Sequence, residues 1–156
     1  MNATLSRRPL RRFWGWGVAC EHLTQEESAR IGMMVQMLGG QITDRTQPQV
    51  SDFTLPAPRI APPAALAAMF SDTTLDRLNH ALGKSYADLA RMWLRQVPHV
   101  PDWVAYPDDE QAVIDILDWA SRHNVAVIPY GGGSSVCGGV EAAVGSSYAA
   151  AVSLDM

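Results

Sequence analysis

The feature that most constrains how this chain can fold is a glycine-rich run directly behind an apolar segment. Residues 128–141 read IPYGGGSSVCGGVE, with five glycines between positions 131 and 139. Glycine has no side chain to pack and loses the most backbone entropy on folding, so this density needs a structural reason. The main chain here either approaches another group closely or adopts positive φ angles.

A strand, a helix and a second strand are predicted just before this run. The apolar segment Trp103–Tyr106 lies among prolines and favours a short strand. Residues 108–124 form the clearest helix, because acidic residues crowd its start and Asp108 and Gln111 have capping-box spacing. The β-branched segment 125–128 then leads into the glycines, which completes a βαβ unit. The apolar face predicted for the helix consists of Val113, Ile114, Leu117 and Ala120.

Residues 1–96 predict a helical and proline-rich extension, and residues 97–156 a separate domain start. Large aromatic residues near the N-terminus favour attachment of that segment to a domain surface. A helix is expected over Glu26–Leu38, with three methionines as its packing face, followed by an extended connector over residues 41–63. Helical pattern returns over Ala64–Leu94. The N-cap candidates there are Ser71, Asp72 and Ser85.

The charge distribution argues against nucleic-acid binding. The formal net charge is −4, and four of the twelve basic residues stand within the first dozen positions, at 7, 8, 11 and 12. A nucleic-acid-binding domain normally carries basic residues along its body. Four arginines could meet an anionic partner, but without an amphipathic helix they do not predict a membrane anchor. No apolar run approaches the roughly 18 residues of a membrane span.

Cysteine and histidine positions predict neither a metal site nor a disulfide framework. Cys20 and Cys137 lack the spacing of metal ligands, and no two of the four histidines stand at ligand spacing. The histidines are expected at the surface or at helix ends, and the acidic residues 108–110 are expected to be a solvated helix start. These features predict a cytoplasmic protein in a reducing compartment.

Several kinds of loop could explain the glycine run. A dinucleotide-binding GxGxxG turn needs a helix to follow, and residues 140–148 are too short and too interrupted for one. A P-loop needs a lysine where Gly139 stands. A nest of backbone N–H groups around a phosphate, assisted by the hydroxyls of Ser134 and Ser135, fits a loop between two strands. A surface loop without a ligand remains the alternative.

The stretch PDWVAYPDDEQAVIDILDWASRHNVAVIPYGGGSSV resembles the start of the FAD-binding domain of vanillyl-alcohol-oxidase/p-cresol-methylhydroxylase (PCMH)-type flavoproteins. The segments GWG at 15–17, DRLNHALGKSYADL and VSLDM are similar to the alkyldihydroxyacetonephosphate synthase branch and its FAD-linked oxidase relatives. The resemblance covers residues 76–156 well and the first 75 only at scattered positions. It implies an α+β fold, the N-terminal part of a PCMH-type domain, with the βαβ unit and glycine loop preceded by the extension.

The resemblance also implies which residues contact the cofactor. FAD would be bound through its pyrophosphate by Pro129, Tyr130, Gly131, Gly132, Gly133, Ser134, Ser135 and Val136. Serine at position 134 replaces the histidine that holds the flavin covalently in some members, so non-covalent FAD is expected. Cys137 is expected to be a small buried thiol rather than an attachment point. No catalytic residue is assigned.

Members of this family continue for hundreds of residues beyond the point that corresponds to Met156. The chain is therefore expected to be the FAD-binding segment of an FAD-dependent oxidoreductase or of an enzyme similar to alkyldihydroxyacetonephosphate synthase, incomplete and inactive alone. The alternative is a non-catalytic truncated product or small interaction domain without flavin. Substrate and oligomeric state are not predicted by these residues.

Overall fold

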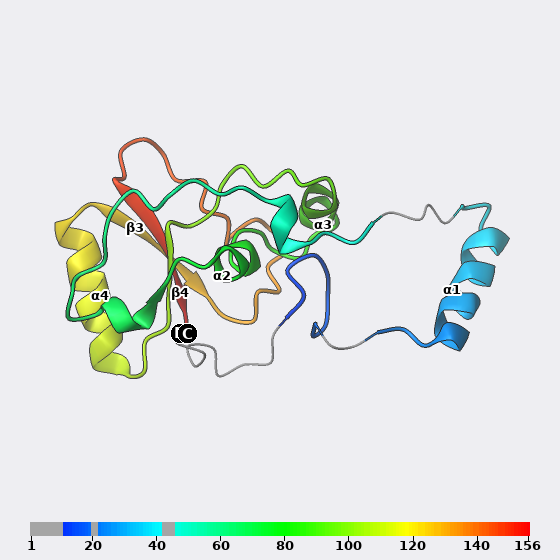
Figure 1. Cartoon of the computed structure of the whole chain (residues 1–156), viewed down its shortest axis with the longest axis horizontal. Coiled ribbons are helices and arrows are strands. Elements are labelled where there is room, and N and C mark those ends of the chain that lie inside the picture. Colours follow the sequence, from blue (N-terminus) through cyan, green and yellow to red (C-terminus); the bar gives the residue numbers. More distant parts are fainter. Residues whose placement is uncertain (1–10, 20–21, 42–45) are drawn as a thin grey trace.

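A computed structural model describes residues 11–19, 22–41 and 46–156. The described residues form an α+β fold around one four-stranded sheet, as the sequence predicts (Figure 1). The strands are β1 (Phe70–Ser71), β2 (Trp103–Ala105), β3 (Val125–Tyr130) and β4 (Ala150–Asp155). The helices are α1 (Gln25–Met37), α2 (Thr74–Asn79), α3 (Tyr86–Trp93) and α4 (Glu110–Arg122), with short 3₁₀ turns at Val50–Asp52 and Ala67–Met69.

The sheet differs from a simple βαβ unit in one respect. Its strand order is β1-β2-β4-β3, so β4 lies between the two strands that α4 connects. β4 runs parallel to both of them, and β1 pairs antiparallel with β2 at the edge. The last strand therefore closes the sheet by entering its centre, which the pattern of strands and helices in the sequence does not reveal.

Helix α4 packs on one face of this sheet through a side different in part from the predicted one. Ile116, Trp119 and Ala120 are buried against Val152 and other residues of the sheet. The predicted buried residues Ile114 and Leu117 are instead 43% and 45% exposed. The large ring of Trp119, which packs edge-on against Phe70 at 5.5 Å between centroids, sets the rotation of the helix.

The opposite face of the sheet is covered by α2 and by the loop after β3. Ala142 of that loop packs on Ile128 and Ala151, and the side chain of His80 at the end of α2 lies against Tyr130. A second apolar cluster lies beyond α2 and joins the N-terminal segment to the body. Its buried members are Phe13, Leu78, Ala81, Leu82 and Met92.

Helix α1 forms within one residue of its predicted bounds but does not pack. Thr24 and Glu27 form a capping box that explains its start. None of its residues is buried, and the predicted methionine packing face is exposed, from 59% at Met33 to 87% at Met37. Figure 1 shows the helix standing apart from the rest of the protein. The prediction of a packing face is therefore wrong for the structure of this chain.

Two helices also begin at residues other than the predicted ones. Ser71 is buried in β1, and Thr73, not Ser71 or Asp72, caps α2. The residues just before this cap form a 3₁₀ turn and a strand instead of the predicted helix. Helix α4 is capped by Asp109 one residue after the prediction, whereas Ser85 caps α3 with Asp88 as predicted.

A buried carboxylate connects the long connector to the centre of the sheet. Asp102 is 3% exposed and accepts hydrogen bonds from the backbone N–H and the guanidinium of Arg59. It also accepts from the N–H of Ala151 at 2.8 Å, just where β4 begins. Burial would raise the pKa of Asp102, but the hydrogen bonds from Arg59 and Ala151 outweigh it and hold the pKa below its ordinary value.

An Asp102→Asn variant is expected to lower the free energy of unfolding at pH 7 by about 1–2 kcal/mol, because Arg59 and Ala151 then share a neutral acceptor. A carboxyl with a depressed pKa in the folded state stabilises above its unfolded pKa, and this contribution disappears as pH falls. The difference between wild type and variant should therefore shrink below about pH 4. Urea unfolding at pH 7 and pH 3 measures it. The exposed Asp118→Asn serves as control, and an equal loss in both variants would contradict this role.

Candidate functional site

The glycine loop begins where the parallel strands of the sheet end. Tyr106 follows β2, Gly131 follows β3 and Asp155 ends β4, and all three stand at one edge because these strands are parallel. The carboxyl edge of parallel strands is where open α/β sheets bind ligands. Residues 131–149 then return along the sheet to the start of β4 without any helix or strand. Connections longer than about 12–15 residues without secondary structure commonly carry a function.

Gly133 has the conformation that requires glycine. Its φ is +67°, and a Cβ built there would overlap the hydroxyl and ring of Tyr130. That hydroxyl donates a hydrogen bond of 2.8 Å to the carbonyl of Asn79. The turn after β3 therefore packs directly on Tyr130, whose position this hydrogen bond fixes.

Gly132 differs from Gly133 in conformation. Among the glycines of this loop, only Gly133 and Gly138 have a positive φ. A Cβ at Gly132 would lie 3.6 Å from Nη1 of Arg11 and 3.7 Å from Oγ of Ser134, which is ordinary contact. A positive φ at Gly133 directly after a glycine without one is compatible with a nest, in which successive N–H groups turn toward the same side.

A pocket of about 400 Å³ lies between the loop and the N-terminal segment, within the size range of small-ligand sites. Gly132 and Ser134 supply one wall, and Lys84 lines it from the turn between α2 and α3. The facing wall is formed by Arg11, Gly15, Trp16, Gly17 and Val18. Half of the lining residues are glycine or serine, two carry cationic side chains, and none is a carboxylate.

Lys84 joins the two walls. Its backbone N–H donates to the carbonyl of Ser135 at 2.7 Å, and its ammonium donates to the carbonyls of Arg12 and Phe13 at 3.0 and 3.2 Å. Burial, together with the nearby charge of Arg11, lowers the pKa of Lys84 to about 8. The preceding Gly83 is buried against the same loop, and a Cβ there would overlap the Ser135 carbonyl.

A buried polar cluster supports the base of the loop. The ring of His80 lies 4.0 Å from that of Tyr130 between centroids, and its Nε2 is 3.4 Å from a carboxylate oxygen of Asp155. Burial raises the pKa of Tyr106, and the charge of the neighbouring Asp76 is the next largest cause of this increase. Tyr130 is thus held from two sides, and the glycines that follow it are positioned by packing.

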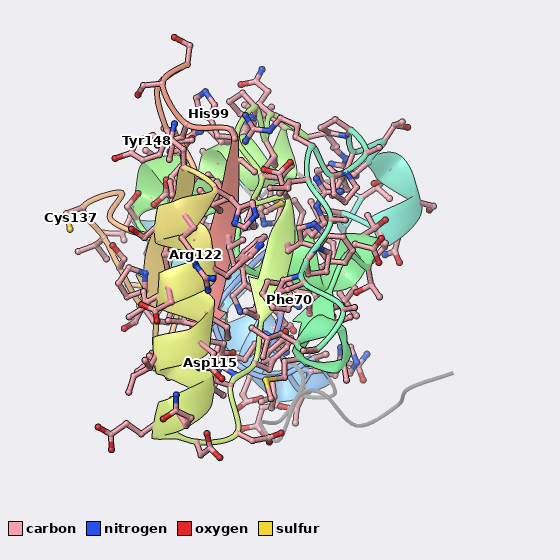
Figure 2. The ribbon with its side chains drawn as sticks, turned by 90° about the vertical axis from the view of Figure 1, so that its left-hand side faces the viewer. Phe70, His99, Asp115, Arg122, Cys137 and Tyr148 are labelled. Atoms are coloured by element: carbon pink, nitrogen blue, oxygen red, sulfur yellow. The ribbon has the colours of Figure 1, made fainter. Side chains whose placement is uncertain are left out.

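The outer part of the loop is held by charged groups on α3 and before β2. Glu141 pairs with Arg91 at 2.5 Å and with His99 at 2.9 Å. Hydrogen bonds from Arg91 lower the pKa of Glu141 against the opposing effect of burial. Figure 2 shows Cys137 at the outer edge of the loop, pointing away from the body. Cys137 is exposed, so the prediction of a buried thiol is wrong.

The eight predicted binding residues take up different positions. Gly132 and Ser134 line the pocket, and Gly131 borders open space with nothing within 4 Å of a built Cβ. Gly133 and Tyr130 are buried beneath the loop, and the Ser135 hydroxyl accepts from the N–H of Gly139 at 3.2 Å. The two remaining residues, Pro129 and Val136, are exposed and do not line this pocket.

Sequence reasoning missed the facing wall and Lys84 as parts of the site. In the sequence, Arg11 is one of four clustered arginines, and GWG indicates only a similarity to a family. Nothing in the local sequence marks Lys84, because its position depends on the turn between two helices. Phe13 and Trp14 do attach the N-terminal segment to the body as predicted, whereas Trp16 is 54% exposed at the pocket.

The histidines of the described ranges match the prediction of surface or helix-end positions. His80 and His123 end α2 and α4, and His99 is half-exposed. No group of three or more metal-ligating side chains comes together within residues 11–19, 22–41 and 46–156. Over the same ranges, no helix has the length and apolar character needed to cross a membrane.

Residues 101–156 match the family model described as FAD binding domain. The chain is 39% identical over 80 residues to alkyldihydroxyacetonephosphate synthase of Trypanosoma brucei brucei, covering 51% of this chain and 13% of that protein. It is 35% identical over 91 residues to the protein of the same name from Dictyostelium discoideum, covering 58% and 15%. The chain thus spans only a small part of the length of these relatives.

A solved structure of an alkyldihydroxyacetonephosphate synthase superposes on 93% of this chain with a TM-score of 0.76 and 27% identity, covering 32% of that chain. A second structure of that name gives a TM-score of 0.74 and 25% identity, covering 93% of this chain and 31% of the other. The superposition includes most of the first 75 residues, where the sequence resemblance is scattered. The matches confirm the predicted family resemblance, the α+β fold and FAD as cofactor.

Proposed function

We propose that this chain, which is an FAD-binding segment of the alkyldihydroxyacetonephosphate synthase-like branch of flavoproteins, holds the pyrophosphate of FAD in the pocket at Gly132 and Ser134. The observation that carries the proposal is the bare backbone at the carboxyl edge of the parallel strands, facing a lining with two cations and no carboxylate. A dianionic pyrophosphate matches such a lining in charge.

The residues fit this cofactor fragment in shape as well as charge. A Cβ at Gly132 would project toward Arg11, so glycine leaves the space in which a phosphate can approach the main chain. The hydroxyl of Ser134 adds a donor at the same wall. The pocket of about 400 Å³ suits the pyrophosphate with the adjoining sugar atoms rather than a whole dinucleotide.

FAD, when bound, supplies hydride chemistry, and the residues of this chain supply binding and orientation. We propose non-covalent binding, because Ser134 cannot form the bond of an attachment histidine and the exposed Cys137 points away from the body. We assign no catalytic residue to the chain. The predicted division at residues 96 and 97 stays a proposal, in which the extension contributes a wall of the site.

The relatives' names suggest the reaction of a whole protein that contains this segment. We propose that such a protein acts as an alkyldihydroxyacetonephosphate synthase, with oxidation of a hydroxy acid or alcohol as the alternative reaction. The expected cytoplasmic location belongs to the same proposal. The support is the 39% identity to the Trypanosoma brucei brucei protein over 80 residues.

FAD is expected to bind the chain saturably in equilibrium dialysis, with ADP as competitor and riboflavin at least about tenfold weaker. ADP shares the pyrophosphate with FAD, whereas riboflavin lacks it and loses the charge-assisted hydrogen bonds, each worth about 1.5–3 kcal/mol. Acid precipitation of the complex should leave the flavin in solution. Riboflavin binding as tightly as FAD, or no FAD binding by a folded chain, would overturn the proposed site.

A further inference from the structure

We propose that the segment Arg11–Val18 forms one of the two walls of the cofactor site, and that the Arg11 guanidinium binds a phosphate of the cofactor opposite the glycine loop. The proposal rests on the proposed function and adds a binding residue to it. It assigns a role to Arg11, which lies far in the sequence from residues 101–156 that match the FAD binding domain.

The segment is a fixed wall. Arg11 and Val18 form an antiparallel bridge, and the N–H of Arg12 donates to the carbonyl of Gly17 at 3.1 Å. Phe13 is 8% exposed and packs edge-on against Phe53 at 5.9 Å between ring centroids. These contacts close the segment into a small hairpin and seat its base in a hydrophobic cluster.

A second set of contacts attaches the hairpin to α3 and to the loop. The ring of Trp14 lies edge-on to Trp93, 5.7 Å between centroids, and Nε1 of Trp93 donates to the Trp14 carbonyl at 2.9 Å. Lys84 links the hairpin carbonyls to the Ser135 carbonyl of the glycine loop. The distance between the two walls is therefore set by direct hydrogen bonds.

Arg11 is the side chain of this wall that can meet an anion. Its Nη1 lies 3.6 Å from the Cβ position of Gly132, directly over the exposed backbone of the loop. None of the ion pairs among the described residues includes Arg11. The ammonium of Lys84, in contrast, already donates to two carbonyls.

The charges that line the pocket also favour the binding of an anion. The positive charge of Arg11 is one of the causes that lower the pKa of Lys84, second to burial, and Asp88 only partly opposes them. Two cations facing the same pocket repel each other, and a bound phosphate relieves this repulsion. A guanidinium opposite backbone N–H groups would hold the phosphate between two walls, with bidentate geometry at the arginine.

The experiment compares Arg11→Gln with the wild-type chain and with Arg30→Gln, which removes the same charge from exposed α1. Calorimetric titration measures the affinities for FAD and for inorganic pyrophosphate, and circular dichroism measures thermal unfolding without ligand. Arg11→Gln is expected to weaken both affinities about tenfold. Arg30→Gln should leave both unchanged, and all three proteins should unfold at similar temperatures.

Wild-type affinities in Arg11→Gln would overturn the role of Arg11 while leaving the proposed function standing. An equal loss in Arg30→Gln would also overturn it, because the effect would then be one of net charge. A folded wild-type chain that binds neither FAD nor pyrophosphate would instead overturn the proposed function. Should Arg11→Gln unfold early, Arg11→Lys replaces it, and here weakened FAD binding with unchanged stability supports the bidentate contact.

Discussion

Replacement of Gly83 by alanine is expected to lower the free energy of unfolding by about 2–4 kcal/mol. The added Cβ would overlap the Ser135 carbonyl oxygen and lie 3.0 Å from a carboxylate oxygen of Asp88. The Ser135 carbonyl accepts the N–H of Lys84, so the loop cannot retreat without breaking that hydrogen bond. Asp88 is itself fixed in the capping box of α3.

Urea unfolding followed by circular dichroism measures this loss. Gly145→Ala is the matched control, because its Cβ would meet only the Ser147 hydroxyl at 3.8 Å. We expect the control to change stability by less than about 0.5 kcal/mol. Equal stabilities of the two variants would contradict the close approach of the α2–α3 turn to the loop.

Gly133→Ala is expected to cost about 2–3 kcal/mol of stability and to weaken FAD binding at least about tenfold. Its φ of +67° is unfavourable for any residue with a Cβ, and the added methyl would displace Tyr130 from Asn79 and His80. The loop backbone that follows would then lose its position over the pocket.

Gly132→Ala separates the two causes of this loss. Its added methyl has room beside Arg11 and needs no strained backbone. We therefore expect nearly unchanged unfolding without ligand, but weaker FAD binding, because the methyl occupies space at the phosphate. Titration with FAD and melting without it, for both variants, test this contrast. Gly132→Ala as unstable as Gly133→Ala would show that the glycines serve packing alone.

The sequence predicts those parts of the fold that are specified locally. Strand β2, helix α4 and strand β3 follow from prolines, caps and β-branched residues, and the structure confirms them. The cap of α3 at Ser85 is equally local. The interrupted sequence after the glycines argues against the helix that a dinucleotide-binding turn requires, and residues 131–149 indeed contain no helix.

The parts that the sequence does not predict depend on contacts between distant segments. The insertion of β4 between β2 and β3 follows from register, and the rotation of α4 follows from the packing of Trp119 on Phe70. In the same way, the glycine run predicts a place where backbone is exposed, but not what faces it. Arg11 and Lys84 reach the pocket only through the hairpin and the α2–α3 turn, neither of which has a signature of its own.

The two walls of the pocket are also synthesised at different times. Arg11 leaves the ribosome before Gly132 and the central strand β4, which follow after more than a hundred further residues. Chains are synthesised at about 5–20 residues per second, so the hairpin waits for at least several seconds without its facing loop. Lys84, which joins the walls, has no Ser135 carbonyl to meet during that interval. In a nascent chain the two walls of the pocket can therefore meet only after the glycine loop has been synthesised.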